Sequence, residues 1–412
     1  MNRRQFLRGI SANAILAAGT CLWLRTGKAL GATEPHPASA FIDPATAAVW
    51  LAKWEKNILA ETKSRYCDSE TGEEIGWKVS PFLSGFHYGF LATRDTKWID
   101  LLVDWTDAVL KRAVKEPDGF LGWPKGDGGG NTSAEYSADS LLGDAMLLEP
   151  VVQLSAEILK TPALESKYGE SARHYIGVAK NMFQKWDSRD CWRTNKDGGL
   201  WVVPGWGVDL KDRAKWSAGY ANRKTTGFSN PDNKQNLIAS WLVALHDATG
   251  DAEPRNRAEA WWRLMRARMT TRENGKYFVW NYWEPGGPWD FRAGGAPKHW
   301  IGVHPNGGYY EIDVNGIVKA FEHGLVFKRE DIDRLIATNR DFMWNQKVEG
   351  AKFKCIDGGK PDSRWPDTPG VLWTALAPYD ETLHKIFVAN FNPATWGGLA
   401  TTPWAVSRTS KA

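Results

Sequence analysis

The stretch that decides the fold is residues 230–270, NPDNKQNLIASWLVALHDATGDAEPRNRAEAWWRLMRARMT. Its apolar residues recur with helical spacing on both sides of Thr249-Gly250-Asp251, which predicts helices over 230–249 and 254–270. Three residues suffice only for a tight turn, so the two helices must run antiparallel to each other. The stretch therefore predicts one helical hairpin.

The same hairpin pattern recurs along the chain at intervals of roughly 70 to 80 residues. Further helices are predicted over 43–62, 81–92, 96–113, 137–160, 166–187, 309–324, 329–345, 370–377 and 380–389. Tight turns within hairpins alternate with long loops between them, at 63–80, 114–136, 188–229, 271–308 and 346–369. Such alternation predicts an all-α fold, an (α/α) toroid or incomplete barrel of about five to seven hairpins with its long loops at one mouth. A solenoid of hairpins is the alternative, but solenoid loops are usually short and uniform.

The first 32 residues have the order of a twin-arginine signal peptide. Arg3 and Arg4 precede a modestly apolar stretch and the small residues Gly31 and Ala32. We expect their removal, leaving residues 33–412 as a single catalytic domain that is periplasmic or secreted. Residues 1–32 hold five Lys and Arg and no Asp or Glu, so the formal net charge of +4 becomes 4 − 5 = −1. This balance predicts neither nucleic acid nor a membrane as partner, and it leaves the oligomeric state open.

The cysteines do not predict a stapled fold or a zinc site. Cys67, Cys191 and Cys355 remain after residue 32, so at most one disulfide can form. Their scattered spacing lacks a zinc signature.

Tryptophan is strongly over-represented, with 24 residues in 412. Eleven of them fall in the long loops: Trp77, Trp123, Trp192, Trp201, Trp206, Trp216, Trp280, Trp283, Trp289, Trp300 and Trp365. Indole faces suit the C–H faces of sugar rings, and the bland alternative is that they wedge large loops together. We expect a carbohydrate groove whose aromatic contacts include Trp123, Trp206, Trp283, Trp289 and Trp300.

The densest cluster of polar and aromatic residues precedes the helix predicted over 309–324. It comprises WEPGGPWD (283–290), KHW (298–300) and HPNGGYY (304–310). Tyr310 falls on the apolar stripe of that helix, which leaves Tyr309 as the freer phenol. His299, His304 and Asn306 are expected near it.

Two other inner helices begin with similar polar segments, GGGNTSAEYSAD (128–139) and NPDNKQN (230–236). Asn233 and Asn236 are three residues apart and share a helix face, and Glu135 and Asp139 share one too. Helix capping accounts for many such segments without any catalytic role.

Two kinds of sugar chemistry fit these residues. A lyase needs a base and a group that neutralises the uronate carboxylate, and Tyr309, His304, Asn233 or Asn236, and Arg292 or Arg223 supply them. Tyr310, Glu135, His299 and Asn306 join the tryptophans as substrate contacts; no cofactor is required, although a divalent cation is compatible. A glycoside hydrolase needs two carboxylates, with candidates in Glu135, Asp139, Asp232, Glu284 and Asp290.

The hairpins, the Trp-rich loops and the segment HPNGGYYEID (304–313) resemble the toroidal polysaccharide lyases that act on alginate, glucuronan and related uronates. The resemblance implies β-elimination on an acidic polysaccharide, with Tyr309 as base, His304 assisting, and Asn233, Asn236 or Arg292 neutralising the carboxylate. The chain lacks the adjacent Asn-His pair of some toroidal alginate lyases. Residues 82–123 also resemble toroidal hydrolases of unsaturated uronides, which implies roles for Asp139 and Asp232. A glycan-binding protein without catalysis is the third hypothesis.

Overall fold

The computed structural model describes residues 40–125, 136–137, 139–203, 207–209, 216–217, 227–359 and 370–408, with the backbone alone at 136–137, 207–209 and 216–217. The expected signal peptide lies outside the described residues, as do Glu135, Trp206 and Arg223. Residues 39–412 group into one compact unit.

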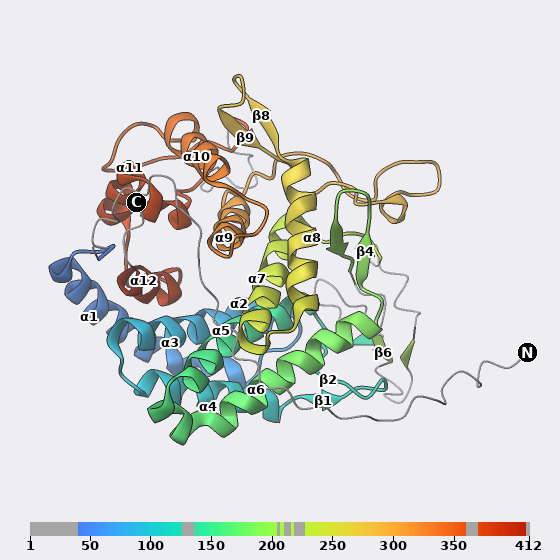
Figure 1. The fold of residues 1–412 in the computed structure, drawn as a ribbon, viewed down its shortest axis with the longest axis vertical. Coiled ribbons are helices and arrows are strands. Elements are labelled where there is room, and N and C mark those ends of the chain that lie inside the picture. The colour runs from blue at the N-terminus through green and yellow to red at the C-terminus, as the bar shows by residue number, and fades with distance from the viewer. Residues whose placement is uncertain are drawn as a thin grey trace, which may run out of the picture. The chain divides into compact units, whose positions relative to one another are not determined.

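The described residues are mostly helical (Figure 1), which confirms the all-α prediction. The α-helices are α1 (Pro44–Glu61), α2 (Glu73–Lys78), α3 (Ser80–Thr93), α4 (Lys97–Lys111), α5 (Leu141–Lys160), α6 (Pro162–Ser188), α7 (Asp232–Thr249), α8 (Ala252–Arg268), α9 (Gly308–Glu322), α10 (Arg329–Ala337), α11 (Glu381–Asn390) and α12 (Gly398–Ser407). A π-helix, η5 (Thr338–Met343), follows α10, and a 3-10 helix, η6 (Thr374–Tyr379), precedes α11.

Short strands occur only within the long connections of the described chain. They form antiparallel pairs between β1 (Val114–Lys115) and β2 (Leu121–Gly122), β4 (Trp192–Thr194) and β5 (Gly199–Trp201), and β8 (Thr270–Arg272) and β9 (Tyr277–Val279). A three-stranded sheet has the order β3 (Tyr136–Ser137), β6 (Gly207–Asp209) and β7 (Trp216–Ser217). None of these sheets is large enough to form a core.

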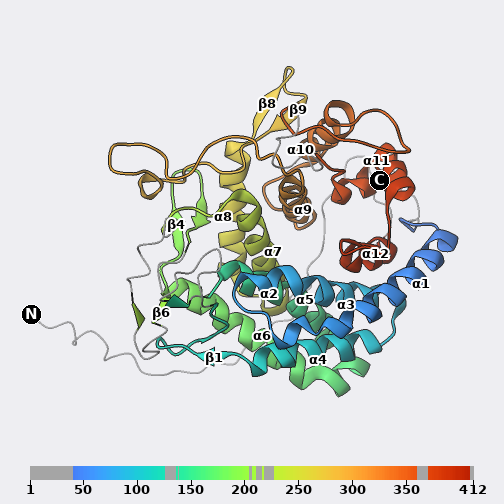
Figure 2. The same ribbon diagram turned by 180° about the vertical axis from the view of Figure 1, so that it is seen from behind.

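The helices pack in the order that the hairpins predict. Helix α3 packs on α4, α5 on α6, and α7 on α8. Across hairpins, α12 packs on α3, α3 on α5, α5 on α7, α7 on α9, and α9 on η6 (Figures 1 and 2). Residues near the two ends of the helical unit thus meet, because α12 lies against α3 and α1.

Capping residues explain several helix boundaries. Asp43 accepts hydrogen bonds from two backbone N–H groups of the first turn of α1, and Ser140 accepts one from Gly143 N at 3.1 Å. Helix α7 ends at Thr249 and is capped by Gly250, whose φ of 75° is the left-handed conformation that glycine adopts without strain. The turn to α8 is therefore as tight as the sequence predicts.

Three sequence expectations need correction. The helix expected over 137–160 begins at Leu141, because Ser140 caps it and Tyr136 and Ser137 belong to β3. The helix expected over 370–377 is the 3-10 helix η6, since Gly370 pairs with Phe353 and Pro378 cannot donate a backbone hydrogen bond. Helices α2 and α12 were not predicted.

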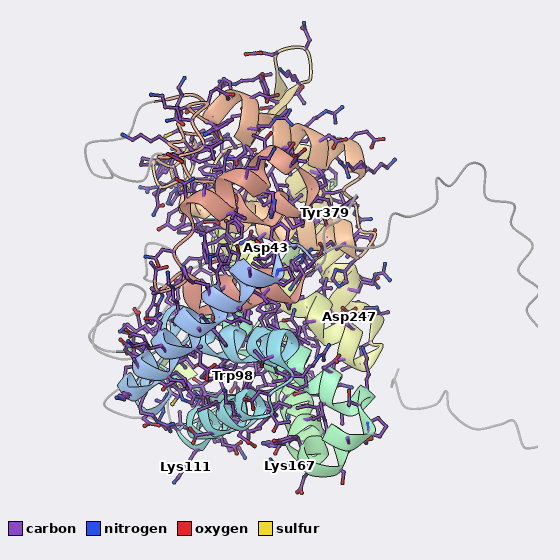
Figure 3. All side chains as sticks on the ribbon, turned by 90° about the vertical axis from the view of Figure 1, so that its left-hand side faces the viewer. Asp43, Trp98, Lys111, Lys167, Asp247 and Tyr379 are labelled. Atoms are coloured by element: carbon purple, nitrogen blue, oxygen red, sulfur yellow. The ribbon has the colours of Figure 1, made fainter. Side chains whose placement is uncertain are left out.

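The two ends of the hairpins differ in their neighbours. In Figure 3, Lys167, Asp247 and Tyr379 lie on one side, and each adjoins a tight turn: α5 to α6, α7 to α8, or η6 to α11. Lys111, at the end of α4 where a long connection begins, lies toward the other side.

No helix among the described residues has the length and apolarity to cross a membrane. Cys67, Cys191 and Cys355 are buried free thiols.

Candidate functional site

Aromatic and imidazole rings gather at the N-terminus of α9, where the sequence predicts the site. The ring centroid of Tyr309 lies 4.6 Å from that of His304, edge to face, and 5.3 Å from that of Tyr282, stacked. Tyr282 is also 4.7 Å from His304 and 5.9 Å from Trp300. We call Tyr282, His299, Trp300, His304 and Tyr309 the mouth cluster.

The backbone holds the mouth cluster between two helix N-termini. Tyr282 N donates to Gly302 O at 2.9 Å, and Tyr282 O accepts from Asp232 N, the first residue of α7, at 3.1 Å. Asn306 Oδ1 accepts from Gly308 N at 3.0 Å and so caps the start of α9. Asn306, expected to touch substrate, therefore has a structural role in this arrangement.

Hydrogen bonds define the protonation of His304. Its Nδ1 accepts from Asn306 N at 3.0 Å, which places the proton of the neutral imidazole on Nε2. Its backbone N–H donates to the hydroxyl of Tyr310 at 2.9 Å. Tyr310 is buried and packs against Trp280, whereas Tyr309 is half-buried, as the apolar stripe predicts. Tyr310, expected to contact substrate, is buried and accepts the backbone N–H of His304.

The two asparagines of α7 have different environments. Asn236 Nδ2 donates to Asp313 Oδ1 at 2.8 Å, and its Oδ1 accepts from the indoles of Trp261 and Trp262 at 3.0 and 2.9 Å. The amide of Asn236, a candidate neutraliser, is thus hydrogen-bonded in the core. Asn233 is equally buried, but its Oδ1 has no hydrogen-bond partner in the described chain. A buried amide oxygen without a hydrogen-bond partner is unusual in a folded protein.

Asn233 and Tyr309 both lie one turn above a cavity of about 300 Å³. The cavity is lined by Asn236 and Ser240 on α7 and by Ile312 and Gly316 on α9. Residues three, four or seven apart share a helix face. Asn233 therefore lies on the cavity-lining face of α7, and Tyr309 lies on the cavity-lining face of α9. One turn corresponds to about 5.4 Å along the helix axis.

Buried acids lie beneath the mouth cluster. Asp232 Oδ1 is 2.8 Å from Arg268 Nη1, while its buried Oδ2 has no partner among the described residues. Burial raises the pKa of Asp232 to about 7. Burial and the nearby Asp232 raise the pKa of Asp313 well above its usual value. Burial is also the main cause of the raised pKa of the Tyr282 phenol, with Tyr309 and Asp313 contributing.

The loop tryptophans have mixed roles. Trp123 and Trp283 are 2% and 0% exposed and donate to the carbonyls of Val109 and Ser229, both at 2.8 Å. Both indoles, expected as sugar platforms, are thus packed inside the protein and hold loop segments together. Trp289 is half-buried and donates to Ser229 Oγ, whereas Trp300 is 46% exposed at the edge of the mouth cluster.

Two other sequence candidates are structural or remote. Asp290 is fully buried and accepts from Ser229 N, Ser229 Oγ and Gly286 N at 2.6–2.7 Å, so it fastens the loop. Arg292 is exposed on the outer part of the loop, with its Nη2 3.4 Å from Lys298 O. Within the described chain, Arg292 has no hydrogen bond or ring contact with the mouth cluster.

Asp139, a candidate acid for hydrolysis, lies in a separate buried ion cluster. Its Oδ2 is 2.5 Å from Lys185 Nζ and 3.5 Å from Arg189 Nη1. Glu116 and Asp144 contact the same lysine at 3.8 and 3.2 Å. All five side chains are at least 96% buried.

Sequence reasoning missed Tyr282 and the importance of Asp313. Tyr282 directly precedes the segment 283–290, and Asp313 is one turn from Tyr309 in HPNGGYYEID.

Across the described residues, no group of three or more His, Cys, Asp or Glu side chains is arranged to hold a metal ion. Comparison of the chain with protein-family models, curated proteins and solved structures gave no match.

Proposed function

We propose that this protein is a polysaccharide lyase that cleaves a uronic-acid-containing polysaccharide by β-elimination. The observation that carries the proposal is the half-buried phenol of Tyr309, packed against His304 and Tyr282 at the N-terminus of α9. A phenol and an imidazole in contact supply the proton transfers of elimination without a metal. Trp300 beside them offers an exposed aromatic face for a sugar ring.

In the proposed reaction, Tyr309 reacts as its phenolate, having released its own proton to solvent, and its oxygen takes the proton from C5 of the uronate. The C5–H electron pair forms the C4–C5 double bond while the C4–O bond breaks, and the departing oxygen takes a proton from Tyr309 or Tyr282. Asn233, at the N-terminus of α7, is the group that neutralises the carboxylate, with its Nδ2 as the donor to the uronate oxygen. The positive end of the helix dipole favours an anion at the same place.

We also propose that the helices form an incomplete (α/α) toroid. Its inner ring consists of α12, α3, α5, α7, α9 and η6, which pack in that order. All six line the cavity, and α1, α4, α6, α8, α10 and α11 form the outer layer. Inner helices α3, α5, α7 and α9 each follow a long connection, so their N-termini adjoin the mouth.

The decisive experiment is incubation with alginate, glucuronan, pectate and glycosaminoglycans while absorbance near 235 nm is followed. We expect absorbance from the new C4–C5 double bond with at least one polymer. Tyr309→Phe removes one hydroxyl and is expected to lower the rate by about 10²–10⁴-fold. Tyr310→Phe is the matched control, since it changes the neighbouring phenol that only positions His304. Full activity of Tyr309→Phe would refute Tyr309 as the base.

Hydrolysis is the second candidate, and Asp232 is the observation that favours it. A carboxyl group whose pKa is raised to about 7 by burial keeps its proton near neutral pH and can serve as a general acid. New reducing ends without absorbance at 235 nm, lost in Asp232→Asn, would establish hydrolysis. Saturable glycan binding with neither product would identify a binding protein.

A further inference from the structure

The cavity inside the helices is a separate polar compartment below the mouth cluster. Its volume of about 300 Å³ is at the lower end of small-molecule sites, which span about 300–1,000 Å³. Asn315 on its wall is exposed, so the cavity reaches solvent. The space is suited to one small molecule rather than to a length of polymer.

The cations on the cavity wall are already paired with acids. Lys319 on α9 forms an ion pair with Glu149 on α5. Arg408, after α12, forms one with Glu322, which also accepts from Tyr379 Oη at 2.6 Å. Each positive charge is thus balanced by a carboxylate from another part of the chain.

A third acid makes the wall unfavourable for an anion. Glu311 Oε1 accepts from Thr374 Oγ1 at 3.0 Å, and no ion pair of Glu311 occurs within the described residues. The wall therefore holds three carboxyl groups and two cations. A uronate carboxylate placed here would lose its hydration without gaining a free cation.

Uncharged groups on the wall are left without partners. The side chains of Ser84 and Tyr88 on α3, Ser240 on α7 and Asn315 on α9 form no hydrogen bond with any residue that the structure describes. Trp404 on α12 adds an aromatic face to the same wall. Hydroxyl and amide groups from three helices together with one indole match the hydroxyls and C–H faces of a sugar.

We propose that this cavity binds one neutral monosaccharide unit, either a free sugar or an uncharged residue of a glycan. The site is distinct from the mouth cluster and does not depend on the lyase reaction. Recognition rests on the unpaired hydroxyl and amide groups, and selection against uronates rests on the absence of an uncommitted cation on the wall.

The test is calorimetric titration of the full protein with pairs of sugars that differ only at C6: glucose and glucuronate, galactose and galacturonate, mannose and mannuronate. We expect saturable binding of at least one neutral sugar, and at least tenfold weaker binding of its uronate. Binding of no neutral sugar, or equal binding of both members of each pair, would overturn the proposal.

Variants place the binding in the cavity. Ser240→Leu fills the space and should abolish binding, while the matched control Ser240→Ala should weaken it only several-fold. If Ser240→Leu does not fold, Asn315→Ala replaces it, because this exposed position tolerates truncation and should weaken binding at least fivefold. Wild-type affinity in both Ser240→Leu and Asn315→Ala would refute the cavity as the site.

Methyl glycosides distinguish the two sources of the sugar. Equal affinity for the glycoside and the free sugar indicates a residue of a glycan, and weaker binding of the glycoside indicates a free sugar; either result supports the site. Absorbance at 235 nm is measured separately, so failure of the lyase proposal leaves the titration interpretable.

Discussion

Replacement of Glu116 by Gln tests the electrostatics of the buried ion cluster. Glu116 is 5% exposed, hydrogen-bonds to Asp139 and contacts Arg189 at 2.7 Å. Burial, then the adjacent Asp139, raises the pKa of Glu116 to about 9. The pKa of Asp139 stays below its usual value, because Lys185, Glu116 and Arg189 outweigh the effect of its burial. The two carboxyl groups therefore share one proton at neutral pH.

The sign of the pH dependence follows from this raised pKa. Between about pH 4.5 and 9 the folded protein keeps the proton on Glu116, whereas the unfolded chain has lost it. The free energy of unfolding must therefore fall as pH rises through this window, by at most about 1.4 kcal/mol per pH unit for one proton. Glu116→Gln has the shape of the protonated acid without its titration. It should match the wild type near pH 5 and exceed it by up to about 3 kcal/mol at pH 8 relative to pH 6.

The assay is thermal unfolding of both proteins from pH 5 to 9. For a domain of this size 1 kcal/mol corresponds to roughly 1–2 °C, so the difference in Tm should grow by about 3–5 °C between pH 6 and 8. Asp118→Asn is the control, since it removes another partner of Arg189, at 2.8 Å, without touching the shared proton. It should lower Tm and keep the wild-type slope. Parallel curves for wild type and Glu116→Gln would refute the shared proton.

The remaining predictions concern packing, the two asparagines and the thiols. Gly122→Ala should destabilise the protein strongly, because the new Cβ would lie 2.0 Å from Asp139 Oδ2. Gly177→Ala, whose new Cβ would have nothing within 4 Å, should stabilise α6 by about 0.5–1 kcal/mol. The Tm of each variant measures both effects. Asn236→Ala should lower the free energy of unfolding, measured in urea, by about 2–4 kcal/mol, because two indoles and a carboxyl group lose their hydrogen-bond partner. Asn233→Ala should leave the free energy of unfolding near that of the wild type and abolish elimination. The free cysteines at 67, 191 and 355 should resist a thiol reagent until guanidinium unfolds the protein, because they are buried; fast reaction of the folded protein would contradict their burial.

Local sequence signals predicted the helices well because they depend on nearby residues. The hairpin at 230–270 is found almost as expected, since apolar spacing and Gly250 act within a few residues of where they are read. Helix α5 starts later than expected because residues 136–137 pair with β6, about 70 residues away. Such a pairing leaves no mark on the local pattern.

The sequence predicted where aromatic and polar residues gather, but not which of them are buried or hydrogen-bonded. Trp283 and Trp300 occur in one loop, yet one is fully buried and the other 46% exposed, because Ser229 O accepts from the first indole. The sequence predicts Asp139 as a candidate catalytic acid. In the structure, its carboxylate contacts Lys185 and Arg189, about 50 residues later in the chain. Side-chain partners from distant segments decide whether a polar residue is structural or functional.

The different environments of Asn236 and Asn233 show how the N-terminal part of α7 is held. Asn236 fastens α7 to α8 through hydrogen bonds with Trp261 and Trp262 and to α9 through one with Asp313. One turn above, Asn233 is equally buried, and its Oδ1 has no hydrogen-bond partner among the described residues. An unpaired buried amide costs free energy, and a fully satisfied network directly beneath it fixes the backbone that presents it. Loosening that network through Asn236 should therefore impair elimination as well as stability, although Asn236 itself has no atom left to offer a substrate.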